Sequence, residues 1–106
     1  MNLTTDRIRA LNDDLRHNLP NGHAVMTAGV AILGPEAVAR IIKTIAMYDD
    51  FCQANDPYGE HDFGSLEADG HKIFFKIDLY EEPNVKDPNG ERVVNRVMTI
   101  MLAEEY

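Results

Sequence analysis

One ten-residue segment, Asn55 to Gly64, holds most of the side chains in this chain that could do chemistry. It reads Asn-Asp-Pro-Tyr-Gly-Glu-His-Asp-Phe-Gly, with three carboxylates, an imidazole and two aromatic rings. Loops with such side chains carry binding and catalytic functions more often than plain polar turns do. The candidate binding residues, including one carboxylate from a strand expected further along, are Asn55, Asp56, Tyr58, Glu60, His61, Asp62, Phe63 and Asp78.

The residue types in this segment leave several uses open. A divalent metal could be held by His61 with Asp56, Glu60 or Asp62, and with Asp78 from the next strand, because one imidazole with carboxylates suits manganese, iron or zinc. General acid–base catalysis by His61 would need an orienting carboxylate, and no motif supplies a nucleophile beside it. A stiff recognition loop would present Tyr58 and Phe63 to a protein partner. Alternatively, the segment is a purely structural loop that buries the same groups. We name no catalytic residue and expect no cofactor.

The acidic charge of the chain is concentrated in its second half. The 106 residues carry a net charge of −8, and residues 55–106 hold twelve acidic against five basic side chains. Binding to a nucleic-acid backbone requires a positive surface, so we expect no direct nucleic-acid contact. An acidic surface suits a positively charged protein partner, such as a nucleic-acid-handling protein. The alternative is that the charge serves only solubility.

Neither a membrane span nor an export signal is expected. The longest uncharged stretch, Asn18 to Pro35, is interrupted by proline and glycine residues. Residues 1–6 contain no basic region followed by an apolar run. Cys52 is the only cysteine, which excludes an internal disulfide and fits a reducing compartment. We therefore expect a cytoplasmic protein.

Two segments have the apolar spacing of amphipathic helices. In residues 4–19, apolar side chains recur every three or four positions. The polar side chains on or beside the opposite face of this helix are Asn12, Asp13, Arg16 and His17. A second helix is expected from Pro35 to about Ala54, since proline suits the first helical position. Residues 28–34 fit either a strand or a helical turn.

The second half of the chain shows the two-residue period of strands. In residues 71–80 this alternation predicts that Ile73, Phe75, Ile77 and Leu79 face the core. A hairpin is expected over residues 63–80 around Asp69-Gly70, a favoured two-residue turn. Residues 81–92 are expected to form a long loop. Residues 93–103 form a predicted strand that is apolar on both faces, which is typical of a central strand.

These elements predict one domain over residues 1–106. With a short strand at residues 23–27, the predicted order is α-β-α-β-β-β. We predict an α+β fold in which two helices pack on one face of a three- to four-stranded, mainly antiparallel sheet. Three of the strands form an antiparallel meander, and the first strand is added at an edge.

Several segments together resemble a bacterial domain-of-unknown-function family, number 3768. They are Asn55–Gly64, Lys76–Asp78 with Tyr80, Arg96–Tyr106, Leu11–Asp13 with Arg16, and Thr27 with Gly29 and Val30. The resemblance spans nearly the whole chain, and Leu79 stands where the family pattern has an aromatic residue. It implies no reaction. It implies an accessory protein of the kind carried on mobile elements, acting as an inhibitor of a host defence or nucleic-acid enzyme.

The leading hypothesis is a non-enzymatic binding module whose acidic loop docks on a basic protein surface. The alternative is a metal-binding protein or metal-assisted hydrolase centred on His61. A third hypothesis is a homodimer that uses the apolar outer face of the last strand.

Overall fold

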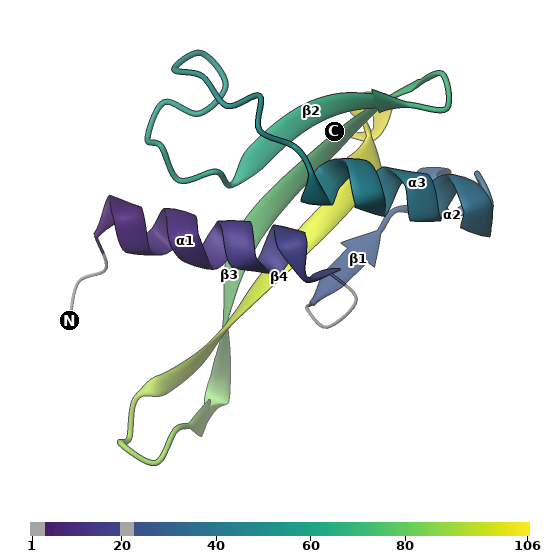
Figure 1. Cartoon of the computed structure of the whole chain (residues 1–106). Coiled ribbons are helices and arrows are strands. Elements are labelled where there is room, and N and C mark those ends of the chain that lie inside the picture. Colours follow the sequence, from purple (N-terminus) through teal and green to yellow (C-terminus); the bar gives the residue numbers. More distant parts are fainter. Residues whose placement is uncertain (1–3, 20–22) are drawn as a thin grey trace.

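A four-stranded sheet with helices on one face forms the fold (Figure 1). The computed structural model describes residues 4–19 and 23–106, and at residues 83–85, 92 and 93 the main chain alone. The predicted α+β class is confirmed. In chain order, the elements are α1 (Thr5–His17), β1 (Ala24–Met26), α2 (Ala28–Ala31), α3 (Pro35–Ala46), β2 (Phe63–Ala68), β3 (His71–Lys86), β4 (Arg92–Leu102) and the 3₁₀ helix η2 (Ala103–Glu105).

The sheet is mixed, with the strand order β1-β4-β3-β2. Strands β2, β3 and β4 form the predicted antiparallel meander. Asp69 and Gly70 turn the chain between β2 and β3 with φ angles of 53° and 79°, which suits a two-residue hairpin. Strand β1 lies at the edge and runs parallel to β4. Strand β4 therefore has a neighbour on both sides, as its apolar character predicted.

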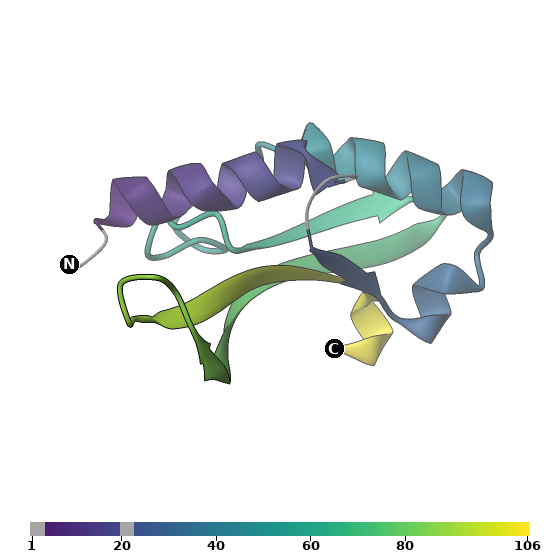
Figure 2. The same ribbon diagram turned by 90° about the horizontal axis from the view of Figure 1, so that it is seen from below.

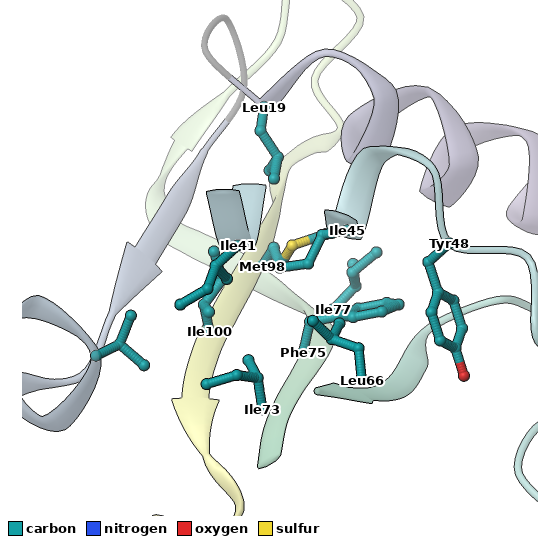
Figure 3. Close-up of a cluster of buried hydrophobic side chains, with 11 residues drawn as sticks. Leu19, Ile41, Ile45, Tyr48, Leu66, Ile73, Phe75, Ile77, Met98 and Ile100 are labelled. Carbon is teal, nitrogen blue, oxygen red and sulfur yellow. The ribbon is translucent and has the colours of Figure 1, made fainter. Parts of the chain in front are cut away.

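The hydrophobic core lies between one face of the sheet and helix α3 (Figure 3). Alternate residues of β3, namely Ile73, Phe75 and Ile77, turn their side chains into this core. They meet Ile41 and Ile45 of α3, both of which are fully buried. Helix α1 lies on the same side of the sheet as α3 (Figure 2), so the predicted placement of both helices is correct.

Helix α3 ends at Ala46, well before the predicted end at Ala54. The reason is a side chain from α1 that replaces the next helical turn: Arg16 Nη1 donates to the carbonyls of Ile45 and Ala46 at 3.1 and 3.3 Å. Residues 47–62 then cross to β2 as an irregular segment, called the connecting loop below. Upstream of α3, the ambiguous residues 28–34 contain the short helix α2.

The loop predicted at residues 81–92 is wrong in extent. Strand β3 continues to Lys86 and β4 begins at Arg92, with a register shift between Glu82 and Lys86. Beyond Leu79 and Arg96, the far ends of β3 and β4 pair with each other and project past the helices as a two-stranded arm (Figure 1). Main-chain pairing continues in this arm although its side chains do not follow the core pattern, because ladder hydrogen bonds do not depend on side-chain polarity. Pattern reading therefore missed it.

Candidate binding site

Asp56 organises the connecting loop from inside. Its carboxylate is only 8% exposed and accepts hydrogen bonds from the main-chain N–H groups of Glu60 and His61, at 3.1 and 3.2 Å. The turn that these bonds close needs positive φ angles at Gly59 and His61, of 67° and 55°. Positive φ is uncommon outside glycine, although histidine tolerates it better than most residues. The carboxylate thus stabilises a conformation that the chain would otherwise rarely adopt.

Helix α1 holds the same turn from outside. Arg9 Nε donates to the carbonyl of Gly59 at 2.6 Å, and Asn12 Nδ2 donates to the carbonyl of Glu60 at 2.9 Å. Asp13 Oδ1 lies 2.8 Å from Nδ1 of His61. Positions 9, 12 and 13 share one face of a helix, because residues three and four apart are neighbours there. One helical face therefore contacts three consecutive loop residues.

Asn12 also joins the loop to the sheet. Its Oδ1 accepts a hydrogen bond of 2.6 Å from Nε of Arg96 on β4, and its side chain is 3% exposed. Burial lowers the pKa of Arg96, and repulsion from Arg7 lowers it further. The predicted site residue Asp78, on β3, pairs instead with Lys76 at 3.3 Å.

Arg16 is the buried cation of the site. Its side chain is 4% exposed, and besides capping α3 it donates to the carbonyl of Tyr48 at 2.5 Å. Its Nη2 donates to Asp13 at 2.8 Å. A cation suits this place, because the carboxyl end of a helix carries partial negative charge. The guanidinium therefore fixes both the end of α3 and the start of the connecting loop.

His61 is enclosed by aromatic and acidic groups. Its ring stacks on Phe51 with centroids 3.8 Å apart and planes 4° apart. Nδ1 faces Asp13, and Nε2 lies 3.6 Å from Oδ2 of Asp56. Burial raises the pKa of Asp13, but hydrogen bonds from Arg16 and His61 outweigh it, so the pKa is lower than usual. Asp13 therefore remains a carboxylate between two donors.

This arrangement bears on the chemistry that His61 can do. A general base needs one ring nitrogen directed at a substrate, whereas both nitrogens here face carboxylates of the same chain. A metal site needs several ligands directed at one point. Among residues 4–19 and 23–106, no group of three or more histidine, cysteine, aspartate or glutamate side chains is placed to hold a metal ion. The metal role of His61, Glu60 and Asp62 stays a prediction.

A pocket of about 440 Å³ opens beside the network, between α1, the end of α3 and the connecting loop. Its wall includes Asp13, Arg16, Tyr48, Phe51 and His61. Tyr48 is held by its hydroxyl, which donates to the carbonyl of Asp50 at 3.1 Å. Burial raises the pKa of this phenol. The pocket is thus built from the groups that order the loop.

Comparison with known families gives one result. Residues 26–105 match the family described as "Protein of unknown function (DUF3768)". The chain belongs to this family. The resemblance expected from the sequence is therefore confirmed, and it carries no activity with it. No curated protein and no solved structure matches the chain. In the described part of this DUF3768 chain, no helix is both long and apolar enough to cross a membrane.

The residues predicted for the site do not all lie together in this DUF3768 protein. Asp56, Glu60 and His61 meet at α1, and Asn55 closes the preceding turn by accepting from the N–H of Cys52 at 2.9 Å. Tyr58, at 78% exposure, lies on the outer side of the loop. Two others lie elsewhere: Phe63 packs on Phe74 and Tyr106 with ring centroids 5.1 and 6.0 Å away, and Asp78 pairs with Lys76.

Sequence reasoning missed the α1 side of the site. Asn12 and Arg16 were predicted to lie on or beside the polar face of the first helix, yet each is 3% exposed. A signal was available, because these two residues are one turn apart and Leu15 and Leu19 extend along a neighbouring face towards the core. Polar residues bordering an apolar stripe are buried where a loop covers that border. Nothing in the sequence indicated which loop does so.

Proposed function

We propose that this protein is a non-enzymatic binding module whose segment 55–64 docks on a positively charged protein surface. One observation carries the proposal: the loop is fixed from behind by α1 while Tyr58 is directed outward and 78% exposed. A loop already held in one conformation loses little conformational entropy when a partner binds. Exposed tyrosine on such a support is a frequent anchor of protein interfaces.

The charge of the chain supports a basic partner. Residues 55–106 carry twelve acidic against five basic side chains, and Glu60 and Asp62 flank the loop's only histidine. A field of one sign steers an oppositely charged partner and raises the association rate, with a strong dependence on salt. A nucleic-acid-handling protein carries such a basic surface where it binds the phosphate groups of nucleic acid. Docking there would compete with nucleic acid, and we propose inhibition by that route.

The proposal places the protein in the cytoplasm. Its single cysteine, Cys52, is exposed on the connecting loop. A free thiol in an accessible loop suits a reducing compartment better than an oxidising one. The proposal needs no bound cofactor, since the loop is ordered by hydrogen bonds from the chain itself.

Capture from the native host followed by affinity measurement tests the proposal. The double variant Glu60→Lys with Asp62→Lys reverses the loop charge without removing any of its main-chain hydrogen bonds. The matched control, Glu67→Lys with Glu104→Lys, changes the net charge equally at exposed positions away from the loop. We expect the loop variant to bind the captured partner about tenfold more weakly or worse, and the control to resemble the wild type.

Salt dependence gives a second criterion in the same experiment. We expect the wild-type affinity to fall as salt rises, because the Debye length shortens from about 10 Å at 0.1 M to about 3 Å at 1 M. Equal affinities for the two double variants, or an affinity that does not change with salt, would reject docking through the charge of this loop.

A further inference from the structure

The edge of β3 lies uncovered beyond the point where β2 begins. Phe63, the first residue of β2, pairs with Lys76, whereas β3 continues to Lys86. One more hydrogen bond follows on this side, from the N–H of Ile77 to the carbonyl of Asp62 at 2.8 Å. After that, the connecting loop turns away to α1 through Glu60. No described strand lies beside this stretch of β3 on the side opposite β4.

Two hydrogen bonds show which way the main chain of this edge points. The N–H of Ile77 points to the β2 side of β3, and the N–H of Met98, its partner on β4, points to β1 by donating to His23. Ile77 and Met98 therefore form a pair without mutual hydrogen bonds. Directions alternate along a strand, so Leu79 turns its N–H and its carbonyl to the same open side. No described residue accepts from or donates to them there.

The side chains along this edge, residues 78–82, are either large and apolar or acidic. Leu79 and Tyr80 are 56% and 52% exposed, although Ile73, Phe75 and Ile77 earlier on the same strand are buried. Asp78, Glu81 and Glu82 accompany them in the sequence. A strand added to the edge would place its own side chains opposite these, where opposite charges stabilise and like charges destabilise. The acidic side chains of this edge therefore favour a basic strand and disfavour a second copy of this acidic chain.

We propose that this edge of β3 binds an extended basic segment of the partner protein as an additional strand. The added strand would continue the line of β2 and begin beside Asp62, so that loop and edge form one continuous surface. Main-chain hydrogen bonds at Leu79 supply affinity in this mode of recognition, and alternate side chains supply specificity. The inference rests on the proposed docking function and adds to it the conformation and chemistry of what docks.

A synthetic peptide tests the edge directly, whichever protein the partner proves to be. The probe is an extended peptide of about seven residues in which lysine alternates with valine or threonine, matching typical strand length. A second peptide has the same sequence with alternate amides N-methylated, and a third has glutamate in place of lysine. We expect the lysine peptide to bind, and the other two to bind about tenfold more weakly or not at all.

Amide hydrogen exchange locates the binding. The N–H of Leu79 faces solvent in the free protein, and we expect its exchange to slow by about tenfold or more in the saturated lysine-peptide complex. Absence of binding by the lysine peptide overturns the inference. So does equal affinity of the N-methylated peptide, or an unchanged exchange rate at Leu79 in the complex, because either means that the edge makes no main-chain pairs.

Matched proline variants complete the test. Leu79→Pro removes the N–H that faces the open edge, and Val94→Pro removes one that faces the other side of the arm, since Val94 pairs with Glu81 at an equivalent position. We expect Leu79→Pro to abolish peptide binding and Val94→Pro to retain it, with circular dichroism confirming the fold of both. If Leu79→Pro proves unfolded, the comparison of the N-methylated and parent peptides still decides.

The outcomes separate the two proposals. If the charge-reversed loop loses the captured partner while Leu79→Pro binds it as the wild type does, docking by the loop stands and the added strand is rejected. If the charge-reversed loop variant and Leu79→Pro each bind the captured partner as the wild type does, the docking proposal and the added-strand proposal both fail.

Discussion

Replacing Arg16 with methionine probes the buried network that orders the connecting loop. The substitution keeps a long apolar stem and removes a guanidinium whose side chain is 4% exposed. It deletes the donors to the carbonyls of Ile45 and Tyr48 and to the carboxylate of Asp13. The carbonyl of Ile45 keeps the N–H of Tyr48 at 3.2 Å, whereas the carbonyls of Ala46 and Tyr48 lose the donor that Arg16 gives them.

The size of the effect follows from these contacts. A hydrogen bond from a charged donor contributes about 1.5–3 kcal/mol, and breaking a buried ion pair costs about 3–5 kcal/mol. The contributions do not add, and the Asp13 side chain is 27% exposed and keeps His61. We therefore expect a loss of about 3–4 kcal/mol in the free energy of unfolding. Against a total of about 5–15 kcal/mol, the variant should fold but melt about 15–20 °C lower.

Urea unfolding followed by circular dichroism measures this loss. Lys43→Met, which removes an exposed cation from α3, is the matched control and should change stability by less than about 0.5 kcal/mol. Arg16→Lys keeps the charge without the planar fork and should fall between the two. A loss below about 1 kcal/mol for Arg16→Met would refute the reasoning, because the carbonyls and Asp13 would then have adequate partners without it.

Three further predictions follow from the same structure. The pKa of Asp13 is lowered in the folded state, so its charge stabilises the fold above about pH 4, and this contribution is lost as the pH falls through the folded-state pKa. In Asp13→Asn, the free energy of unfolding should therefore fall less steeply as the pH is lowered below about 4. Gly64→Ala should destabilise by about 1–3 kcal/mol in urea titrations, since a Cβ there would lie 2.3 Å from the ring of Phe75. Glu105→Ala should speed amide exchange at Gly29, whose N–H donates to that carboxylate at 3.2 Å.

The elements of the fold were largely predictable because they follow from local patterns. Alternation of apolar residues placed Ile73, Phe75 and Ile77 in the core, and Asp69-Gly70 placed the hairpin turn. Each of these signals acts over a few residues and agrees with the final packing. The alternation also predicted a core position for Leu79, which is instead 56% exposed. An alternating pattern predicts where a strand lies, but not how much of that strand other elements cover.

The site was predictable in part. The density of polar and aromatic groups in residues 55–64 located the loop, but not the partners that hold it. Asn12, Asp13 and Arg16 are far from His61 in the sequence and meet its surroundings only through the packing of α1 on the loop. Side-chain contacts over such separations leave no periodic trace in one sequence. The end of α3 was missed for the same reason, since a distant arginine determines it.

Amide hydrogen exchange at Glu60 and His61 tests most directly whether the connecting loop is held in one conformation. Both N–H groups donate to the buried carboxylate of Asp56. We predict that they exchange slowly in the free protein, with protection that falls sharply in Asn12→Ala, which cuts the bond from α1 to the loop. Exchange at the rate of an unstructured peptide in the wild type would contradict a pre-organised loop and remove the basis of the docking proposal.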